Sequence, residues 1–319
     1  MTGEHERASR LHRWSKMRVV RLQAHGRRVA ADGRLFVRHP LGLVGLALIL
    51  FFGLMVLSYP VLRATVWDFG YYDPITGFDP TAAPHPSTWT WRHLLGTDNF
   101  GRDVLCQLFA GAQVSFAVGI LAALIAVTIS TTMGGAAGYF GGLVDAALMG
   151  VSDVFVLLPA PVVLLIFGLL LRMRWPTVAV LYGILTGLGA QAIVVKSHTL
   201  KLKARPFIEA ARGAGGGDFH IILTHILPGL SSLTIVHAIF AVVGAVLTES
   251  LLAFFSRTTY YLSWGTMIWL GQETFRWFSL EGQWHAVLPP AFSIMLFCSG
   301  FYLVGRALDD VLNPRLRRR

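Results

Sequence analysis

The chain has 319 residues, of which 54% are hydrophobic and only 14% are charged. Roughly a quarter of the residues in a soluble domain are charged, so this composition excludes an ordinary soluble protein. The net charge of +10 follows the segments that flank the apolar stretches and includes no base-reading motif. It therefore indicates attraction to anionic membrane lipid rather than to nucleic acid.

Six long apolar segments predict an all-α integral membrane protein with about six transmembrane helices, since about 20 apolar residues cross a bilayer. The uncharged stretch 104–144 is too long for one crossing, so we expect its helix to end at the glycines from Gly134 onward. Pro159 and Pro161 should kink the third span. The predicted spans are Leu41–Leu62, Ala110–Met133, Ala146–Leu171, Pro176–Val195, Leu230–Phe255 and Pro289–Leu308.

The distribution of basic residues predicts the orientation of these spans. Residues 1–40 hold ten Lys and Arg against three Asp and Glu, whereas 63–103 hold three against five. Both termini and the segment 196–228 are basic and are expected in the cytoplasm, with Arg172 and Arg174 as outer exceptions. The expected division is a basic cytoplasmic segment 1–37, a first helix and extracytoplasmic loop 38–103, a core transmembrane domain 104–308 and a basic cytoplasmic tail 309–319.

No motif for catalysis, cofactors or metals is found in the chain. It contains no phosphate-binding loop, no His-Glu-x-x-His, no Gly-x-Ser-x-Gly and no Cys-x-x-Cys. Cys106 and Cys298 are expected to pack as small apolar side chains, and the histidines lack the spacing of metal ligands. We predict a non-catalytic protein without a cofactor or metal of its own.

The polar segment 196–228 interrupts the apolar spans. Pro206 should end the helix that leaves the membrane, and residues 207–212 can form a short second helix. After a glycine-rich turn, Asp218 is a suitable N-cap for a further helix that is expected to end at Pro228. Such a helix–turn–helix would present a rigid projection to the cytoplasm.

This segment resembles the EAA loop of ABC-transporter permeases, which in that family docks on the ATP-hydrolysing subunit and transmits its movement. The resemblance implies that this segment couples transport to ATPases, and that ATP and Mg²⁺ bind to those partner subunits. The residues that carry the resemblance are Glu209, Ala210, Ala211, Gly215, His225, Leu227 and Pro228.

The segment 95–103 resembles the LGTDxxGRD signature of the dipeptide, oligopeptide and nickel permeases. Chemically, Asp98 could cap a short helix and Arg102 could pair with Asp103. We favour a structural latch before the second span over direct contact with substrate. The matching residues are Gly96, Thr97, Asp98, Gly101, Arg102 and Asp103.

Two carboxylates lie inside predicted spans, Asp153 in the third and Glu249 in the fifth. Ionisable groups at this depth are usually functional. Pairing between helices is favoured here, and contact with cargo along the path is the alternative.

The resemblance continues through 138–142, 263–265 and 312–316, and the four-residue spacing of Gly134, Gly138 and Gly142 suits close helix packing. The segment 255–262 departs from the family, because it is about two residues shorter than is typical and lacks glycine and proline.

Taken as a member of this family, the chain is expected to have the architecture of a type I ABC importer permease and to be a C-type subunit. The resemblance implies a sister B-type permease, two ATP-binding subunits and an extracytoplasmic solute-binding protein as partners in the inner (plasma) membrane. Peptides or peptide-like solutes are the expected cargo, with nickel or another small solute as the alternative. A stand-alone channel or a membrane enzyme is the alternative from another class.

Overall fold

The computed structural model describes residues 33–81, 91–98, 100–257, 260–273 and 284–312, so most of the predicted N-terminal segment and tail lie outside it. Within these ranges the fold is helical, and the helices occur in the following order. They are α2 (Pro40–Thr65), α3 (Phe69–Tyr72), α4 (Val104–Phe140), α5 (Gly142–Val156), α6 (Ala160–Leu170), α7 (Trp175–Leu188), α8 (Ala190–Lys203), α9 (Pro206–Gly213), α10 (Asp218–Ile221), a π-helical turn (Ile222–Ile226), α11 (Leu227–Ser256), α12 (Trp264–Glu273) and α13 (Trp284–Leu312).

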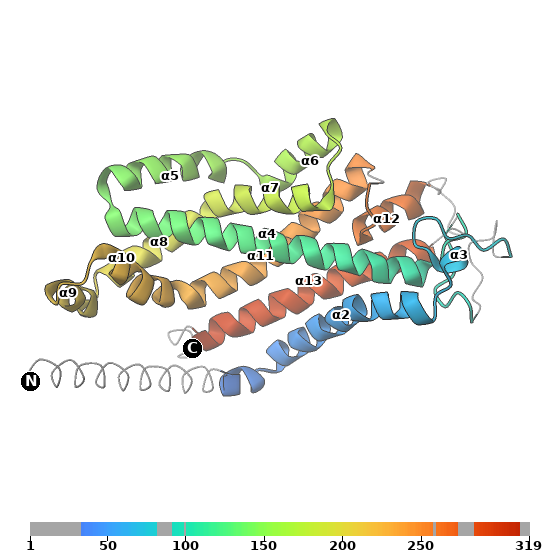
Figure 1. Cartoon of the computed structure of the whole chain (residues 1–319), viewed down its shortest axis with the longest axis horizontal. Helices are drawn as coiled ribbons and strands as arrows, with labels where there is room; N and C mark the ends of the chain where they lie inside the picture. Colours follow the sequence, from blue (N-terminus) through green and yellow to red (C-terminus); the bar gives the residue numbers. More distant parts are fainter. Residues whose placement is uncertain (1–32, 82–90, 99, 258–259, 274–283, 313–319) are drawn as a thin grey trace, which may run out of the picture.

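The helices form an elongated bundle around α4, which packs against α7, α8 and α11, while α2 pairs with α13 (Figure 1). α9 and α10 lie at one end of the bundle and α3 lies at the other. Among the described residues, four helices are long and apolar enough to cross a membrane, or six spans if each of two bent pairs counts as one. The prediction of an all-α membrane protein with about six spans is confirmed.

The second span is longer than predicted, because α4 continues past Gly134 and ends only before Gly141. Gly134 and Gly138 face α8, where a Cβ on Gly138 would lie 2.8 Å from the Cβ of Thr199. These glycines therefore allow close packing instead of ending the helix. Gly142 does not share this role, since it begins α5 with a φ of 56° and no neighbour within 4 Å of a Cβ.

The third and fourth spans are each broken rather than continuous. α5 and α6 meet at 70°, with Pro159 at the N-cap of α6 and Pro161 in its first turn. The predicted proline kink is confirmed, and its size divides the span into two helices. α7 and α8 meet at 43° around Gly189, whose backbone is non-helical, with φ −83° and ψ −130°.

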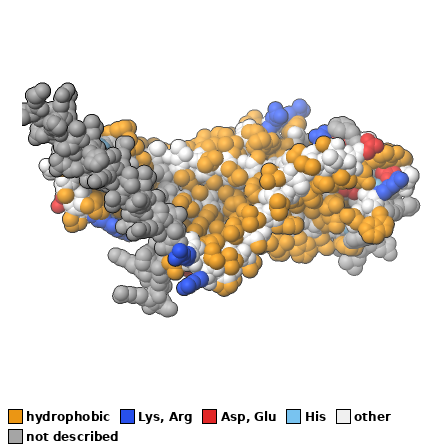
Figure 2. Space-filling model, turned by 60° about the horizontal axis from the view of Figure 1, so that its bottom comes forward, with side chains coloured by type: hydrophobic (Ala, Val, Ile, Leu, Met, Phe, Trp, Pro, Cys, Tyr) orange, Lys and Arg blue, Asp and Glu red, His pale blue; other side chains and the backbone are white. Residues whose placement is uncertain are grey.

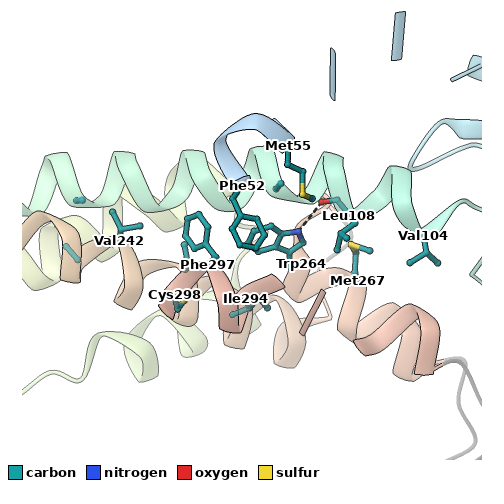
Figure 3. Close-up of a cluster of buried hydrophobic side chains, with 14 of the residues drawn as sticks. Phe52, Met55, Val104, Leu108, Val242, Trp264, Met267, Ile294, Phe297 and Cys298 are labelled. Atoms are coloured by element: carbon teal, nitrogen blue, oxygen red, sulfur yellow. Dashed lines mark hydrogen bonds between the residues drawn. The ribbon is translucent and has the colours of Figure 1, made fainter. Parts of the chain in front are cut away.

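The indole of Trp264 anchors α12 in the core (Figure 3). Its Nε1 donates a hydrogen bond to the carbonyl of Leu108 at 3.0 Å. Its ring centroid lies 5.3 Å from that of Phe52 and 5.5 Å from that of Phe297 in edge-on contacts. Each such pair contributes about 0.5–1.5 kcal/mol beyond area burial, so this cluster fixes α12 against α2, α4 and α13.

The outer surface of the bundle is apolar, as lipid requires. Leu54 and Leu57 of α2 are 67% and 70% exposed. Hydrophobic side chains cover most of the middle of the face shown in Figure 2, and the acidic side chains visible there lie near its ends. The long axis of the bundle is therefore the direction in which the chain crosses the membrane.

Candidate functional site

The segment between α8 and α11, residues 204–226, extends beyond the bundle at the end that carries α9 (Figure 1). α8 ends at Lys203, and α9 begins directly at Pro206 with Arg205 at its N-cap. Proline suits the first turn of a helix because the amide hydrogen it lacks would have no partner there. The predicted break at Pro206 and the short helix after it are confirmed.

The turn after α9 depends on two glycines. Gly215 has a φ of 83°, in the left-handed region that side chains with a Cβ disfavour. The amide of Gly216 donates to the carbonyl of Ala211 at 3.0 Å, and a Cβ on Gly216 would lie 2.8 Å from that same oxygen. Gly215 thus permits the reversal of the chain, and Gly216 permits the close approach of the backbone to the Ala211 carbonyl.

The predicted helix from the Asp218 cap to Pro228 is wrong at both ends. Asp218 is the first residue of α10, and its side chain caps no helix. α10 continues through the π-helical turn into α11, where Pro228 lies in the first turn. The π turn widens the helix just before Pro228, which relieves the clash between a proline ring and the carbonyl four residues earlier.

The projecting segment has a buried and an exposed side. Ile208, Ile221 and Ile226 are buried in one apolar cluster with Leu202 of α8. The residues of the EAA resemblance lie mainly outside this cluster. Glu209, Ala210, Gly215 and Pro228 are exposed, while Ala211, His225 and Leu227 are half-buried.

Large apolar side chains are also exposed on this segment, with Phe207 at 44% and Phe219 at 75%. Exposed aromatic side chains on a projecting segment are typical of a protein contact. We name the exposed side of residues 206–226 the coupling face.

Tyr139, near the end of α4, joins the projecting segment to the bundle. Its hydroxyl donates a hydrogen bond to the Asp218 carboxylate at 2.6 Å. The Lys203 ammonium donates to the carbonyl of Tyr139 at 2.6 Å, and the Arg212 guanidinium lies 5.4 Å from the centroid of its ring. The sequence places Tyr139 in a family motif but assigns it no partner, because its contacts lie far away along the chain.

At the other end of the bundle, the signature residues form a closed loop. Asp98 accepts hydrogen bonds from the Arg102 backbone amide at 3.0 Å, from Arg102 Nε at 2.7 Å and from Gln107 Nε2 at 2.8 Å. Arg102 therefore pairs with Asp98 and not, as predicted, with Asp103. Gly96 and Gly101 have φ values of 79° and 73°, so the loop needs glycine at both positions.

Asp103, and not Asp98, caps a helix in this region. Its Oδ1 accepts from the amide of Cys106 at 2.6 Å at the start of α4. The carbonyl of Thr97 lies 2.9 Å from Nε2 of His285 in α13. The signature loop thus links the start of α4 to α13, which is the geometry of a structural latch.

His93, a residue with no predicted role, lies between two carboxylates in this loop. Its Nδ1 is 2.8 Å from Asp103 Oδ2, and its Nε2 is 3.0 Å from Asp79 Oδ2, with all three side chains buried. The hydrogen bond with Asp103, and then that with Asp79, raises the pKa of His93 against the effect of burial. Burial alone would raise the pKa of Asp79, but hydrogen bonds from Thr81 and His93 outweigh it and lower that pKa to about 2.

The two carboxylates predicted within spans lie in different surroundings. Glu249 is completely buried in α11, and Asp153 is exposed on α5. Neither has an ion-pair partner among the described residues. Their role in helix pairing or in the path stays a prediction.

Comparison with known proteins finds one family that matches more than half of the chain. Residues 126–318 match the family described as the inner membrane component of binding-protein-dependent transport systems. The dipeptide transport system permease protein of Bacillus subtilis is 34% identical over 228 residues, which are 71% of this chain and 70% of that protein. The oligopeptide transport system permease protein of Haemophilus influenzae is 31% identical over 305 residues, 94% of this chain and 93% of that protein.

A third similar protein is the glutathione transport system permease protein of Pectobacterium atrosepticum. It is 30% identical over 227 residues, which are 70% of this chain and 73% of that protein. The family match includes the whole projecting segment, and the alignment with the Haemophilus protein covers nearly the whole chain.

Proposed function

The chain belongs to the family of inner membrane components of binding-protein-dependent transport systems, and from this premise we propose that it forms half of the path of an ATP-driven importer for peptides or peptide-like solutes. Its fold is that of the type I ABC importer permeases. As a permease subunit of this class, it would leave ATP hydrolysis, with ATP and Mg²⁺, to partner subunits.

The coupling face is the observation that carries this proposal. It is a compact projection with its own apolar core, and it exposes Glu209, Ala210 and Phe219 at one end of a membrane bundle. A channel has no need of such a surface. A cytoplasmic ATPase bound there could move it as a unit, because Ile208 and Ile226 pack it against α8.

The remaining partners follow from the same premise. A sister B-type permease would complete the path, two ATP-binding subunits would bind the two coupling faces, and a solute-binding protein would deliver cargo at the other end. The excess of Lys and Arg in residues 1–40 supports a cytoplasmic position for the N-terminus, and six spans would leave the C-terminus and the coupling face on that same side.

Transport in this proposal is a change of access driven from the coupling face. ATP binding would bring the ATPases together and shift the equilibrium of the permease pair, provided that the coupling face binds more tightly in one state than in the other. Cargo would then pass from the solute-binding protein to the cytoplasm.

Co-purification and uptake test the proposal together. Mild detergent extraction of the full chain from its native membrane should recover ATP-binding subunits, and the reconstituted complex should show ATP-dependent uptake. Screening peptides and nickel chelates would identify the cargo class. A chain that purifies alone, or uptake that continues without ATP, would contradict the proposal.

The coupling role has its own pair of variants. Gly215→Ala adds a methyl group where φ is 83°, whereas Gly213→Ala adds the same group where a Cβ has open space. Distortion of the turn costs on the order of 1 kcal/mol, so Gly215→Ala should lower uptake several-fold while the chain stays in the membrane, and Gly213→Ala should not. Equal uptake by both variants would exclude a role for this turn.

A further inference from the structure

A cavity of about 320 Å³ lies between the ends of α6 and α11, at the end of the bundle opposite the coupling face. Residues 168–173 line one side of it, and Ser256, Arg257, Tyr260 and Tyr261 line the other. The described lining contains two arginines and no carboxylate. A hollow with this balance of charge suits an anionic group.

The arginine side chains are positioned for such a group. The Arg172 guanidinium lies 5.7 Å from the centroid of the Tyr260 ring, and among the described residues it has no carboxylate partner. Stacking on an aromatic face leaves the N–H groups at the edge of a guanidinium available to a planar acceptor. Carboxylate and phosphate oxygens match that edge with two parallel hydrogen bonds.

Tyr261 and the unusual backbone of Arg257 complete the cavity. Tyr261 is only 9% exposed, and its hydroxyl faces the buried carboxyl group of Glu249 in α11. Arg257 has a φ of 53°, which no other described non-glycine residue shares in the positive range. Strained backbone occurs preferentially at binding and active sites.

The position of these two arginines is also unusual for a membrane protein. Lys and Arg normally collect on the cytoplasmic side, yet Arg172 and Arg257 lie at the opposite end of the bundle. Orientation in the membrane therefore does not explain these two charges.

We propose that this cavity binds the carboxylate or phosphate group of an anionic ligand at the outer end of the permease. Arg172 and Arg257 would donate hydrogen bonds to its oxygens. The carboxylate of an incoming solute and the phosphate of a lipid headgroup share this chemistry. The solute source rests on the proposed transport function, whereas the binding site itself does not.

Direct binding to the intact complex tests the site. Wild type, R172Q and R257Q are placed in phosphatidylcholine nanodiscs with their co-purified subunits. R174Q is the matched control, because Arg174 lies in the same loop but does not line the cavity. The two probes are tetra-alanine with a free carboxyl terminus and tetra-alanine amide, and native mass spectrometry of a second preparation counts retained phosphatidylglycerol.

A charge-assisted contact of this kind corresponds to about a tenfold change in affinity. R172Q and R257Q should each weaken binding of the carboxylate peptide by about that factor, or reduce retained phosphatidylglycerol, while R174Q does neither. The affected arm identifies the source of the anion. If an arginine variant proves unstable, R172K takes its place. Lysine keeps the charge but lacks the planar edge, so R172K should give an intermediate loss of binding.

Equal behaviour of R172Q, R257Q and R174Q in both arms would overturn the site. That result is distinct from failure of the proposed function, which would appear as wild-type preparations without ATP-binding subunits or without ATP-dependent uptake.

Discussion

The Tyr139 hydroxyl connects two parts of the chain that are 79 residues apart in sequence. Its bond to the Asp218 carboxylate is charge-assisted, and bonds of this kind contribute about 1.5–3 kcal/mol. Lys203 and Arg212 approach the same residue from α8 and α9. A displacement of the coupling face would therefore reach the central helix α4 through this side chain.

Tyr139→Phe removes the hydroxyl and keeps the ring against which both cations lie. We expect less solute transported per ATP hydrolysed, by about threefold or more, because the coupling face loses a bond worth at least about 1 kcal/mol. The measurement is uptake and ATP hydrolysis in one reconstituted preparation. Tyr302→Phe, the same change on an exposed residue of α13, is the control and should leave the ratio unchanged. An unaltered ratio in Tyr139→Phe would show that α4 receives the movement elsewhere.

The His93 cluster, at the end of the molecule opposite the coupling face, makes the folding stability depend on pH. Because the pKa of His93 is raised, its stabilisation is complete below its unfolded pKa of about 6.5 and is lost as pH rises through the higher folded value. Asp79 has a lowered pKa, so its stabilisation is present above about pH 4 and is lost as pH falls toward 2. Both contributions are complete between about pH 4 and 6.5.

Thermal unfolding of the detergent-solubilised protein at pH 6 and pH 9 tests this cluster. Wild type should lose stability on going to pH 9, and His93→Gln should lose less, because glutamine does not titrate. His220→Gln, at the other end of the bundle, should behave as wild type. The cluster would have no such role if wild type and His93→Gln responded alike.

At the scale of elements, the packing of α4 against α8 depends on glycine. A Cβ on Gly138 would lie 2.8 Å from the Thr199 Cβ and 2.9 Å from the carbonyl of Lys196, while a Cβ on Gly135 has no neighbour within 4 Å. The two glycines lie in the same helix, but only Gly138 contacts α8. Their substitution separates helix packing from helix propensity.

Gly138→Ala should destabilise the protein by about 1–3 kcal/mol, because α8 must move away to make room for the methyl group. Gly135→Ala should leave stability unchanged or raise it by up to about 1 kcal/mol, because alanine favours the helix more than glycine does. Unfolding midpoints in detergent compare the two variants directly. Effects of the same sign and size would mean that α4 and α8 are not in close contact.

The broken spans also belong to this scale. Pro159 was expected to kink one helix, but α5 and α6 diverge by 70°, and nothing local to the sequence specifies that angle. The second break, at Gly189, follows no proline. The position of this break depends on how α7 and α8 each pack along α4, and local residue preferences do not describe that packing.

At the scale of the whole molecule, apolar side chains face both the core and the outside. Trp264 and Phe297 are buried, while Leu54 and Leu57 are exposed on the surface that meets lipid. Hydrophobicity therefore identifies the spans but does not distinguish their two sides. The lipid-facing and core-facing sides separate only once the helices are packed.

The projecting segment shows how far local patterns reach. Pro206 and the glycines after α9 were sufficient to predict a short helix and a reversal, because both residue types restrict or free the backbone directly. Pro228 was misleading, since the π turn before it lets the helix continue. The role of the EAA residues as a docking surface stays a prediction.

The sequence by itself determined the membrane class, the approximate number of spans and the segment that leaves the bundle. Long uncharged stretches and clusters of basic residues have these consequences whatever the packing, because a charged residue inside the bilayer is costly wherever it occurs. Only the tertiary structure decided which polar groups meet, including Arg102 with Asp98, His93 with two carboxylates, and Tyr139 with Asp218. These partners are chosen by the three-dimensional arrangement of helices and loops, and spacing along the chain carries little information about it.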